Sequence, residues 1–460
     1  MLAEKRQTQN GHKNGNGKTK ATSGHGDKST RIIKKNIGQK KLWKERQAPM
    51  YEYKGMSYLQ NQLMLKQNRV KLRYKYYEMK NIVRDLQIST PPALRFWSTS
   101  LGWCAKAVDS LADRLQFREF REDNFGMQEI FNLNNPDTLF DSAIVSALIA
   151  SCCFVYISPD EDGFPRLQII DAADATGIID EQTGLLNEGY AVLKRDESGN
   201  AMIEAYFTAE TTMIYYADGT LEDYPHKAGH PLLVPIIYKP DAVRPFGHSR
   251  ISRSCMDYTA AAVRTIKRSE ISAEFYSFPQ KYMTGLADGA ENQLESWSAA
   301  MSAMLAITKD EDGESPKLGQ FTQQSQAPHV EQLKMIASLF AGECGLTTDD
   351  LGFSTSNPAS SEAIKASHEI LRLTARKAQG YFGTGFLNVG YVAACLRDEY
   401  AYKRRQIYLT TPVWEPIFEP DAAALSVIGD GAIKINQAIP GFFDTENLYD
   451  LTGIRPGGLL

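Results

Sequence analysis

VEQLKMIASLFAGECGLTTDDLGFSTSNPASSEAIKASHEILRLTARKAQGY, residues 330–381, contains two amphipathic helical patterns with a polar loop between them. Apolar residues recur at helical spacing from Val330 to Cys344, and Gly345 supplies a stop signal. The predicted apolar face consists of Val330, Leu333, Ile336, Ala337, Phe340 and Ala341. This half of the stretch therefore predicts a helix that ends at the glycine.

The second pattern begins after Pro358. Ser360 or Ser361 can cap its first turn, where the helix dipole favours the carboxylate of Glu362. The apolar stripe that follows is Ile364, Leu371, Ala375, Ala378 and Phe382. The connection, Leu346–Pro358, is longer than two adjacent helices need, and loops of this kind are usually functional or disordered. It is the first candidate site.

The charge of the chain is distributed unevenly. Its 460 residues, 43% of them apolar, suffice for about two to four globular domains. Residues 1–50 contain thirteen Lys and Arg against three Asp and Glu, so this segment has a net charge of +10. Because the whole chain has a net charge of -4, the remainder has -14. The body of the protein is expected to be acidic.

The six cysteines have no spacing typical of a zinc site. They lie at positions 104, 152, 153, 255, 344 and 395, in apolar or helical surroundings, and we expect buried thiols made in a reducing cytosol. No apolar run approaches the roughly 18 residues of a membrane span, and the N-terminus lacks the apolar centre of a signal peptide. We expect a soluble protein that is intracellular when made and has no membrane partner.

Residues 1–47 are rich in Lys, Gly, Asn, Thr and Ser, a composition that predicts a disordered basic tail. Its stretch Gly15–Thr19 approaches a phosphate-binding loop, but His12 stands where the first glycine should be and no strand precedes it. After the tail, residues 56–86 and 94–115 have helical periodicity. From Cys153 to Tyr238 the period changes to two, with recurrent Asp-Gly, Thr-Gly and Ser-Gly turns, which predicts an antiparallel meander.

Ser249 is the predicted cap of a helix from Arg250 to about Tyr276, which Pro279 ends. Four cations on this helix are candidates for contact with a neighbouring subunit or with DNA: Arg253, Arg264, Lys267 and Arg268. The alternative is a helix with a solvated basic side. Residues 279–327 follow as a compact insertion with an exposed acidic tip formed by Asp310, Glu311, Asp312 and Glu314.

The order of these elements, together with VPIIYKPDAVRPFGHSRISRS at residues 234–254, resembles the portal proteins of tailed bacteriophages, in particular the family of phages that infect Gram-positive bacteria. The resemblance covers roughly residues 50–455 and implies an α+β, portal-like multidomain subunit that assembles into a ring. After the tail (1–47), it implies a wing of helices and antiparallel sheet (48–248), a first stem helix (249–278), a small mixed clip (279–327), a second stem helix (328–345), a tunnel loop (346–361), a long kinked wing helix (362–412) and a short helical crown (413–460).

The family resemblance also implies partners. They are twelve copies of the chain in a ring, double-stranded DNA passing through the channel, the large terminase subunit and head-tail connector proteins at the clip, and the major capsid and scaffolding proteins. The implied location is the portal vertex of the virion, after synthesis in the host cytoplasm. We expect loose DNA contact through the tunnel loop residues Thr347, Thr348, Ser354, Thr355, Ser356 and Asn357, with Asp349 and Asp350 repelling phosphates. Alternatively, the two aspartates only cap a short helical turn.

No catalytic motif is present: the sequence has no nucleophile elbow, no zinc-protease motif, no complete phosphate-binding loop and no dinucleotide fingerprint. His226 and His230 are interrupted by proline and glycine, and His248 lacks a nearby carboxylate in the sequence. We therefore expect no enzyme activity, no cofactor and no metal. The competing hypothesis is a monomeric nucleic-acid-binding protein of a mobile element that uses the basic tail, but the acidic body favours a conduit in which DNA slides.

Overall fold

The computed structural model describes residues 51–84, 92, 95–277, 281–284, 317–320, 325–353, 361–407, 409–418, 420 and 422–454. The chain divides into two units, Met1–Glu52 and Tyr53–Leu460. All described helices and strands belong to the second unit. The predicted tail therefore lies outside the described residues.

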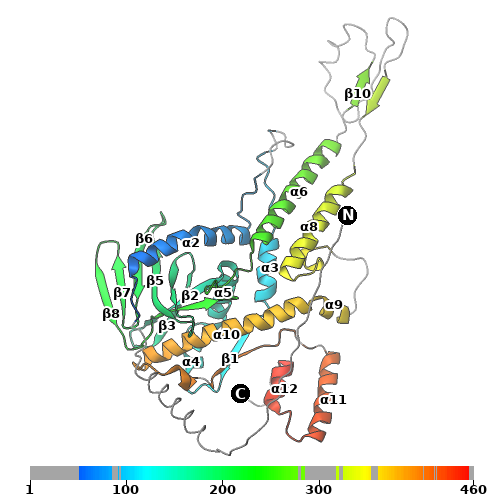
Figure 1. Cartoon of the computed structure of the whole chain (residues 1–460). Helices are drawn as coiled ribbons and strands as arrows, with labels where there is room; N and C mark the ends of the chain where they lie inside the picture. Colours follow the sequence, from blue (N-terminus) through cyan, green and yellow to red (C-terminus); the bar gives the residue numbers. More distant parts are fainter. Residues whose placement is uncertain are drawn as a thin grey trace, which may run out of the picture. The chain divides into compact units, whose positions relative to one another are not determined.

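The predicted meander is present, but it is divided between two antiparallel sheets (Figure 1). Five consecutive strands form the larger sheet in the order β4-β5-β6-β7-β8, and the smaller one has the order β3-β2-β9. The bounds are β2 Cys152–Pro159, β3 Pro165–Asp171, β4 Ala175–Ile179, β5 Leu186–Arg195, β6 Ala201–Phe207, β7 Thr211–Tyr216, β8 Leu221–Pro225 and β9 Leu233–Ile237. β2 pairs with β3 on one side and with β9 on the other. The chain therefore returns to the smaller sheet at β9, after the hairpins of the larger sheet.

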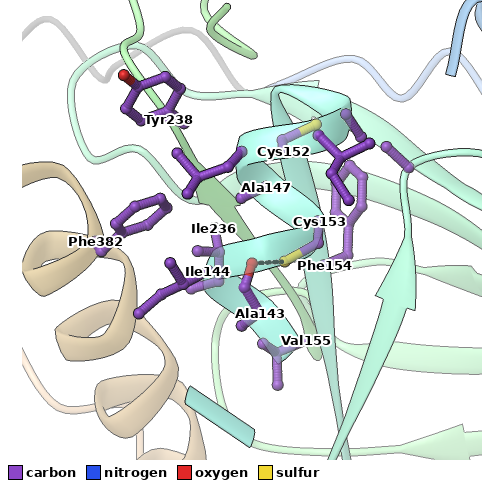
Figure 2. Close-up of a cluster of buried hydrophobic side chains, with 14 of the residues drawn as sticks. Ala143, Ile144, Ala147, Cys152, Cys153, Phe154, Val155, Ile236, Tyr238 and Phe382 are labelled. Carbon is purple, nitrogen blue, oxygen red and sulfur yellow. Dashed lines mark hydrogen bonds between the residues drawn. The ribbon is translucent and has the colours of Figure 1, made fainter. Parts of the chain in front are cut away.

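A buried helix that the periodicity did not predict, α5 (Pro136–Ala150), packs on the smaller sheet. Figure 2 shows Ala143 and Ala147 of α5 beside β2, with Ile236 and Phe382 close by. The Cys153 thiol of β2 donates to the carbonyl oxygen of Ala143 at 3.3 Å. The exposed side of α5 is narrow and includes Asp137, Thr138 and Asp141, while eight of its fifteen residues are buried.

The long helix α10 (Glu369–Arg397) runs beside the same core and also packs against β9 and α4 (Met127–Asn132). Two glycines allow this close approach. A Cβ on Gly385 would lie 2.9 Å from Ile236 Cδ1, and one on Gly390 would lie 2.9 Å from the sulfur of Met127. α10 follows the short helix α9 (Ser361–Ser367) after a break at His368, and it ends at Arg397 rather than near residue 412.

Aromatic side chains from segments far apart in the sequence form the centre of the core. Phe386 of α10 lies 4.7 Å from Phe140 and 6.3 Å from Trp414 between ring centroids. Phe140 in turn stacks on Phe117 at 4.3 Å. Phe117 and Trp414 belong to β1 (Phe117–Arg121) and β12 (Thr411–Trp414), which pair antiparallel. A strand that precedes the meander is thus paired with a strand that follows α10.

The first helices are shorter than their periodicity predicts. α2 is Met56–Tyr77 and α3 is Trp103–Ala112, whereas the prediction extended to residue 86 and over 94–115. Trp97, assigned by the pattern to the buried face, lies outside the helix and is exposed. The helix begins only after Gly102, where Trp103, Ala107 and Leu111 enter the core. Apolar spacing extended the second predicted helix over Phe96 and Trp97, which are exposed.

Two helices follow β12: α11 (Ala422–Ala438) and α12 (Thr445–Thr452). Asp444 caps α12 by accepting from the backbone N–H of Asn447 at 2.8 Å. The Asp450 carboxylate binds Arg118 at 3.0 Å and Arg121 at 2.8 Å, and the Arg118 side chain is almost fully buried. These ion pairs attach α12 to β1, so the C-terminal segment is anchored to the core.

Candidate functional site: the α6–α8 helix pair and the loop after α8

Helices α6 (Arg253–Ser277) and α8 (Ala327–Cys344) lie side by side in opposite chain directions (Figure 1). At one end, Ser252 Oγ donates to Glu343 at 2.8 Å, and Cys255 Sγ lies 3.2 Å from Cys344 Sγ. Further along, Ser269 Oγ lies 3.3 Å from Gln326 Oε1. At 1.5 Å per residue, α6 is about 37 Å long. Between the two helices the chain contains the antiparallel pair β10 (Lys281–Thr284) and β11 (Lys317–Gln320).

The N-terminus of α6 differs from the prediction. Ser252 rather than Ser249 caps it, because the hydroxyl of Ser252 accepts from the N–H of Cys255 at 3.2 Å. Ser249 instead donates to the carbonyl oxygen of Ile149 at the end of α5. Arg250, which the pattern placed in the helix, lies before it and donates to the carbonyl oxygens of Ala107 in α3 and Cys344 in α8. Arg250 therefore connects α3 and α8 at the position where α6 is about to begin.

The four predicted cations of α6 have different surroundings. Arg253 is exposed and its Nε lies 4.0 Å from Asp257, an interaction that contributes little at the surface. Lys267 donates to the carbonyl oxygen of Arg95 at 3.2 Å. Arg264 is half-buried, and the Nε of Arg268 is buried without a hydrogen-bond partner among the described residues. Arg253 is therefore the most accessible of the four.

One face of α8 packs in the core, and several apolar side chains on its other sides are exposed. Ile336, Ala337, Phe340, Ala341 and Cys344 are buried, in agreement with most of the predicted face. Val330, assigned to that face, is exposed. Apolar side chains with exposed fractions of 46–65% occur along α8, α9 and the start of α10: Val330, Met335, Leu339, Ile364, Ile370 and Leu373. Met335 and Leu339 are four residues apart and share one side of α8, which makes this side a candidate protein–protein contact surface.

The first part of the candidate loop has a defined structure. Gly345 ends α8 with a φ of 64°, as its sequence predicts, and Asp349–Leu351 form a single 3₁₀ turn, η2. Asp350 accepts from the N–H of Thr347 at 2.8 Å and from its hydroxyl at 2.9 Å. His368, at the start of α10, also lies 3.2 Å from the Asp350 carboxylate. Asp350 thus joins both sides of the loop.

The two aspartates of the turn have different environments. Asp349 is exposed, and its carboxylate makes no ion pair or hydrogen bond within the described part of the chain. Asp350 is half-buried. Burial alone raises the pKa of Asp350, but the hydrogen bonds from Thr347 and the contact with His368 outweigh it, so this pKa lies below its usual range. Thr347 and Thr348 directly precede the turn and are half-buried.

We predict that Asp350→Ala lowers the free energy of unfolding by about 1–2 kcal/mol, because it removes the acceptor for Thr347 and the link to His368. Asp349→Ala is the matched control and should change it by less than about 0.5 kcal/mol. Since the pKa of Asp350 is lowered by folding, its contribution is present above the unfolded pKa of about 4 and is lost as the pH falls. Thermal unfolding at several pH values checks this, and equal losses for both variants would contradict it.

Several predicted site residues lie outside the described residues. They are Ser354, Thr355, Ser356 and Asn357 of the loop and Asp310, Glu311, Asp312 and Glu314 of the insertion. Their roles remain predictions.

The structure brings a carboxylate to His248, which the sequence did not predict. Asp241 Oδ2 lies 2.6 Å from His248 Nε2, and Arg244 lies 3.4 Å from the other ring nitrogen. The hydroxyl of Ser249 is directed to Ile149, so no serine nucleophile faces this histidine. All six cysteines are buried free thiols. Among the described residues no group of three or more His, Cys, Asp or Glu could hold a metal ion.

In the parts of the chain that the structure describes, no helix is both long and apolar enough to cross a membrane. Sequence comparison gives the portal proteins of Mycobacterium phages L5 and D29. The L5 protein is 26% identical over 333 residues, and the D29 protein is 24% identical over 330 residues. Each match covers 67% of this chain and 67% of the relative.

Among solved structures, similar chains come from a gene transfer agent virion and from the neck of native gene transfer agent particles computed with C12 symmetry. Their TM-scores are 0.45 and 0.44, with 13% and 12% identity. Both matches cover 84% of this chain and 99% of the other. The sequence model of one family, described as phage portal protein, SPP1 Gp6-like, matches residues 57–425, most of the chain. The resemblance inferred from element order is thereby confirmed, and the chain belongs to the SPP1 Gp6-like family of phage portal proteins.

Proposed function

We propose that copies of this chain close into a ring at one capsid vertex and that double-stranded DNA enters and leaves the particle through its channel. The observation that carries the ring is the exposure of apolar side chains on α8, α9 and the start of α10, among them Met335, Leu339 and Ile370. Burying such side chains against a neighbour contributes roughly 25 cal/mol per Å² of apolar area. Heterologous contacts close when the rotation per subunit divides the circle, and the family suggests twelve copies.

In this proposal α6 and α8 are the stem helices and the loop after α8 faces the channel. Asp349 is its most exposed charged group, and a carboxylate in this position repels phosphates and keeps DNA contacts short. Asp350 and Thr347 hold the turn that presents Asp349. The threonines and the loop residues 354–357 supply hydrogen bonds that DNA exchanges readily with water. The acidic body, -14 after residue 50, supports sliding rather than gripping.

The partners follow from the same assignment. The segment 279–327 is the clip, whose acidic tip, residues 310–314, docks the large terminase subunit during packaging and head-tail connector proteins afterwards. Segments 48–248 and 362–412 form the wing, beside the major capsid and scaffolding proteins, and 413–460 is a short crown. The subunit itself is structural, and the terminase supplies the energy of packaging. The alternative of a monomeric nucleic-acid-binding protein is less well supported, since the family match covers the body rather than the basic tail.

A bulky group attached at the channel tests this function. Asp349→Cys should react with a maleimide while the six native cysteines, all buried, stay unmodified. Particles assembled from the labelled variant should contain little DNA, and the loss should increase with the size of the maleimide. The matched control is Asp162→Cys, at an exposed turn between β2 and β3. If both labelled variants package DNA as well as unlabelled protein, the loop does not face the channel.

A further inference from the structure

Helix α2 carries a concentration of positive charge in an otherwise acidic body. Its 22 residues contain five cations and no Asp or Glu: Lys66, Arg69, Lys71, Arg73 and Lys75. The chain after residue 50, by contrast, has a net charge of -14. A helix with charges of one sign only attracts the opposite charge along its whole length.

Three of these cations line a cavity of about 490 Å³ together with two more that are distant in the sequence. Lys66, Arg69 and Arg73 lie on one face of α2, Lys54 precedes the helix, and Arg244 comes from the loop before α6. Glu181 is the one acidic residue among the cavity's described lining residues. The cavity is therefore strongly electropositive.

None of the five cations that line the cavity has a carboxylate within ion-pair distance in the described part of the chain. Their contacts are to neutral groups. Arg73 donates to the carbonyl oxygen of Ala150 at 2.6 Å, Lys66 lies 5.2 Å from the ring centroid of Phe246, and Lys54 lies 5.0 Å from that of Tyr58. Lys54, Arg69 and Arg244 are exposed, whereas Lys66 and Arg73 are half-buried. Because buried charges in proteins are normally paired, the positive charge of these two side chains lacks compensation.

The lack of a paired carboxylate has its largest effect on the two most buried cations, Lys66 and Arg73. Burial lowers the pKa of Lys66, and it lowers the pKa of Arg73 to about 10, with Arg69 and Arg244 adding repulsion. The Nε of Arg73 is also buried without a hydrogen-bond partner among the described residues. An anion in the cavity would offset the repulsion among these neighbouring cations.

The spacing of the cations identifies the shape of the anion. Lys66, Arg69 and Arg73 are separated by three and four residues, so they form a row along one side of the helix. At 1.5 Å per residue this row is about 10 Å long, and Lys54 and Arg244 extend the charged surface. A row of this length fits a ligand with repeated negative charges better than a single ion.

We propose that this face of α2, with Lys54 and Arg244, is a second nucleic-acid-binding surface that holds the phosphate backbone of DNA without reading its sequence. Cations clustered along a helix are the pattern expected for contact with phosphates, which carry no sequence information. This surface is distinct from the channel loop, where an exposed aspartate faces DNA. An acidic protein segment is the competing occupant, and the test separates the two.

The test uses the full chain and a short DNA duplex of mixed sequence. Lys66→Gln with Arg69→Gln should lower DNA affinity and reduce the slope of log affinity against log salt by about 2, roughly one for each cation withdrawn from a phosphate. Lys71→Gln with Lys75→Gln removes the same charge from the opposite, exposed side of α2 and should leave the slope unchanged. Both variants keep the basic residues 1–50, so their difference reports on the cavity face alone.

Acetylation of lysines, read by mass spectrometry, locates the contact independently of folding in the variants. Bound duplex should protect Lys66 in the unmodified chain and leave Lys71 and Lys75 reactive. The proposal is overturned if both double variants have the same slope and Lys66 stays reactive with DNA present. It is equally overturned if poly-glutamate protects Lys66 at a charge concentration at which the duplex does not, because the surface then binds acidic protein.

Discussion

Replacement of Asp349 by lysine should leave the ring intact and strongly impair DNA packaging. The substitution changes the charge by two units in every subunit at an exposed position of the loop, and the Asp349 carboxylate makes no contact with the described residues on which folding depends. Each lysine that reaches a phosphate releases a counterion and adds about 0.9 to the salt slope of DNA retention. DNA that a wild-type ring lets pass should therefore be held, more tightly at low salt than at high salt.

The matched control for this substitution is Asp162→Lys, which makes the same charge change at an exposed turn. It should package DNA as the wild type does. Asp349→Asn, which only removes the repulsion, should have an intermediate effect. If Asp349→Lys particles package normally and rings of this variant retain no more DNA than the control, the loop has no electrostatic role in the channel.

Phe386→Ala should lower the free energy of unfolding by about 3–5 kcal/mol, a large share of the roughly 5–15 kcal/mol typical of a folded domain. Phe386 is fully buried, and its ring contacts residues from α5 and β12, which lie far from it in the sequence. Truncation leaves a cavity where these elements meet, and α10 cannot move inward because Gly385 and Gly390 already pack closely. The expected result is a large decrease in the unfolding midpoint.

Phe442→Ala is the control for that substitution, since Phe442 is 54% exposed and the side chain removed is the same. It should change the unfolding free energy by less than about 0.5 kcal/mol. Urea unfolding at a fixed protein concentration compares the two, because ring formation makes the midpoint depend on concentration. Equal midpoints for the two variants would mean that the aromatic cluster does not centre the core.

Short sequence motifs predicted the features that depend only on residues close together in the chain. Gly345 ends α8 in the left-handed conformation, and the Gly turns of the meander lie where the pattern placed them. Other features depend on contacts between segments that are far apart in the sequence. Ser249 was the expected cap of α6, but its hydroxyl donates to the carbonyl oxygen of Ile149, a hundred residues earlier. Ser252 caps the helix instead. α5 was not predicted, although Asp137, Thr138 and Asp141 lie on its exposed side and eight of its fifteen residues are buried.

The predicted loop after α8 begins with a single 3₁₀ turn, and the sequence could not distinguish the environments of its two aspartates. Asp350 is engaged by His368, which lies 18 residues further along and becomes its neighbour only when α10 is in place. Asp350 accepts hydrogen bonds from Thr347 within the turn and Asp349 is exposed, while the role of either aspartate toward DNA stays a prediction. The sequence of α2 does indicate a basic face, because the helix has five cations and no acidic residue. Arg244, which is distant in the sequence, comes next to this face only when the chain is folded.

The mass and symmetry of the purified full chain test the central claim most directly. Mass measurement and electron microscopy at micromolar concentration should show a closed ring with axial symmetry, twelvefold in the assembled particle, because the apolar side chains Met335, Leu339 and Ile370 need a neighbour to cover them. Substituting these three by serine should shift the population to smaller species while each subunit stays folded. A wild-type chain that remains monomeric or dimeric at every concentration tested would contradict the account.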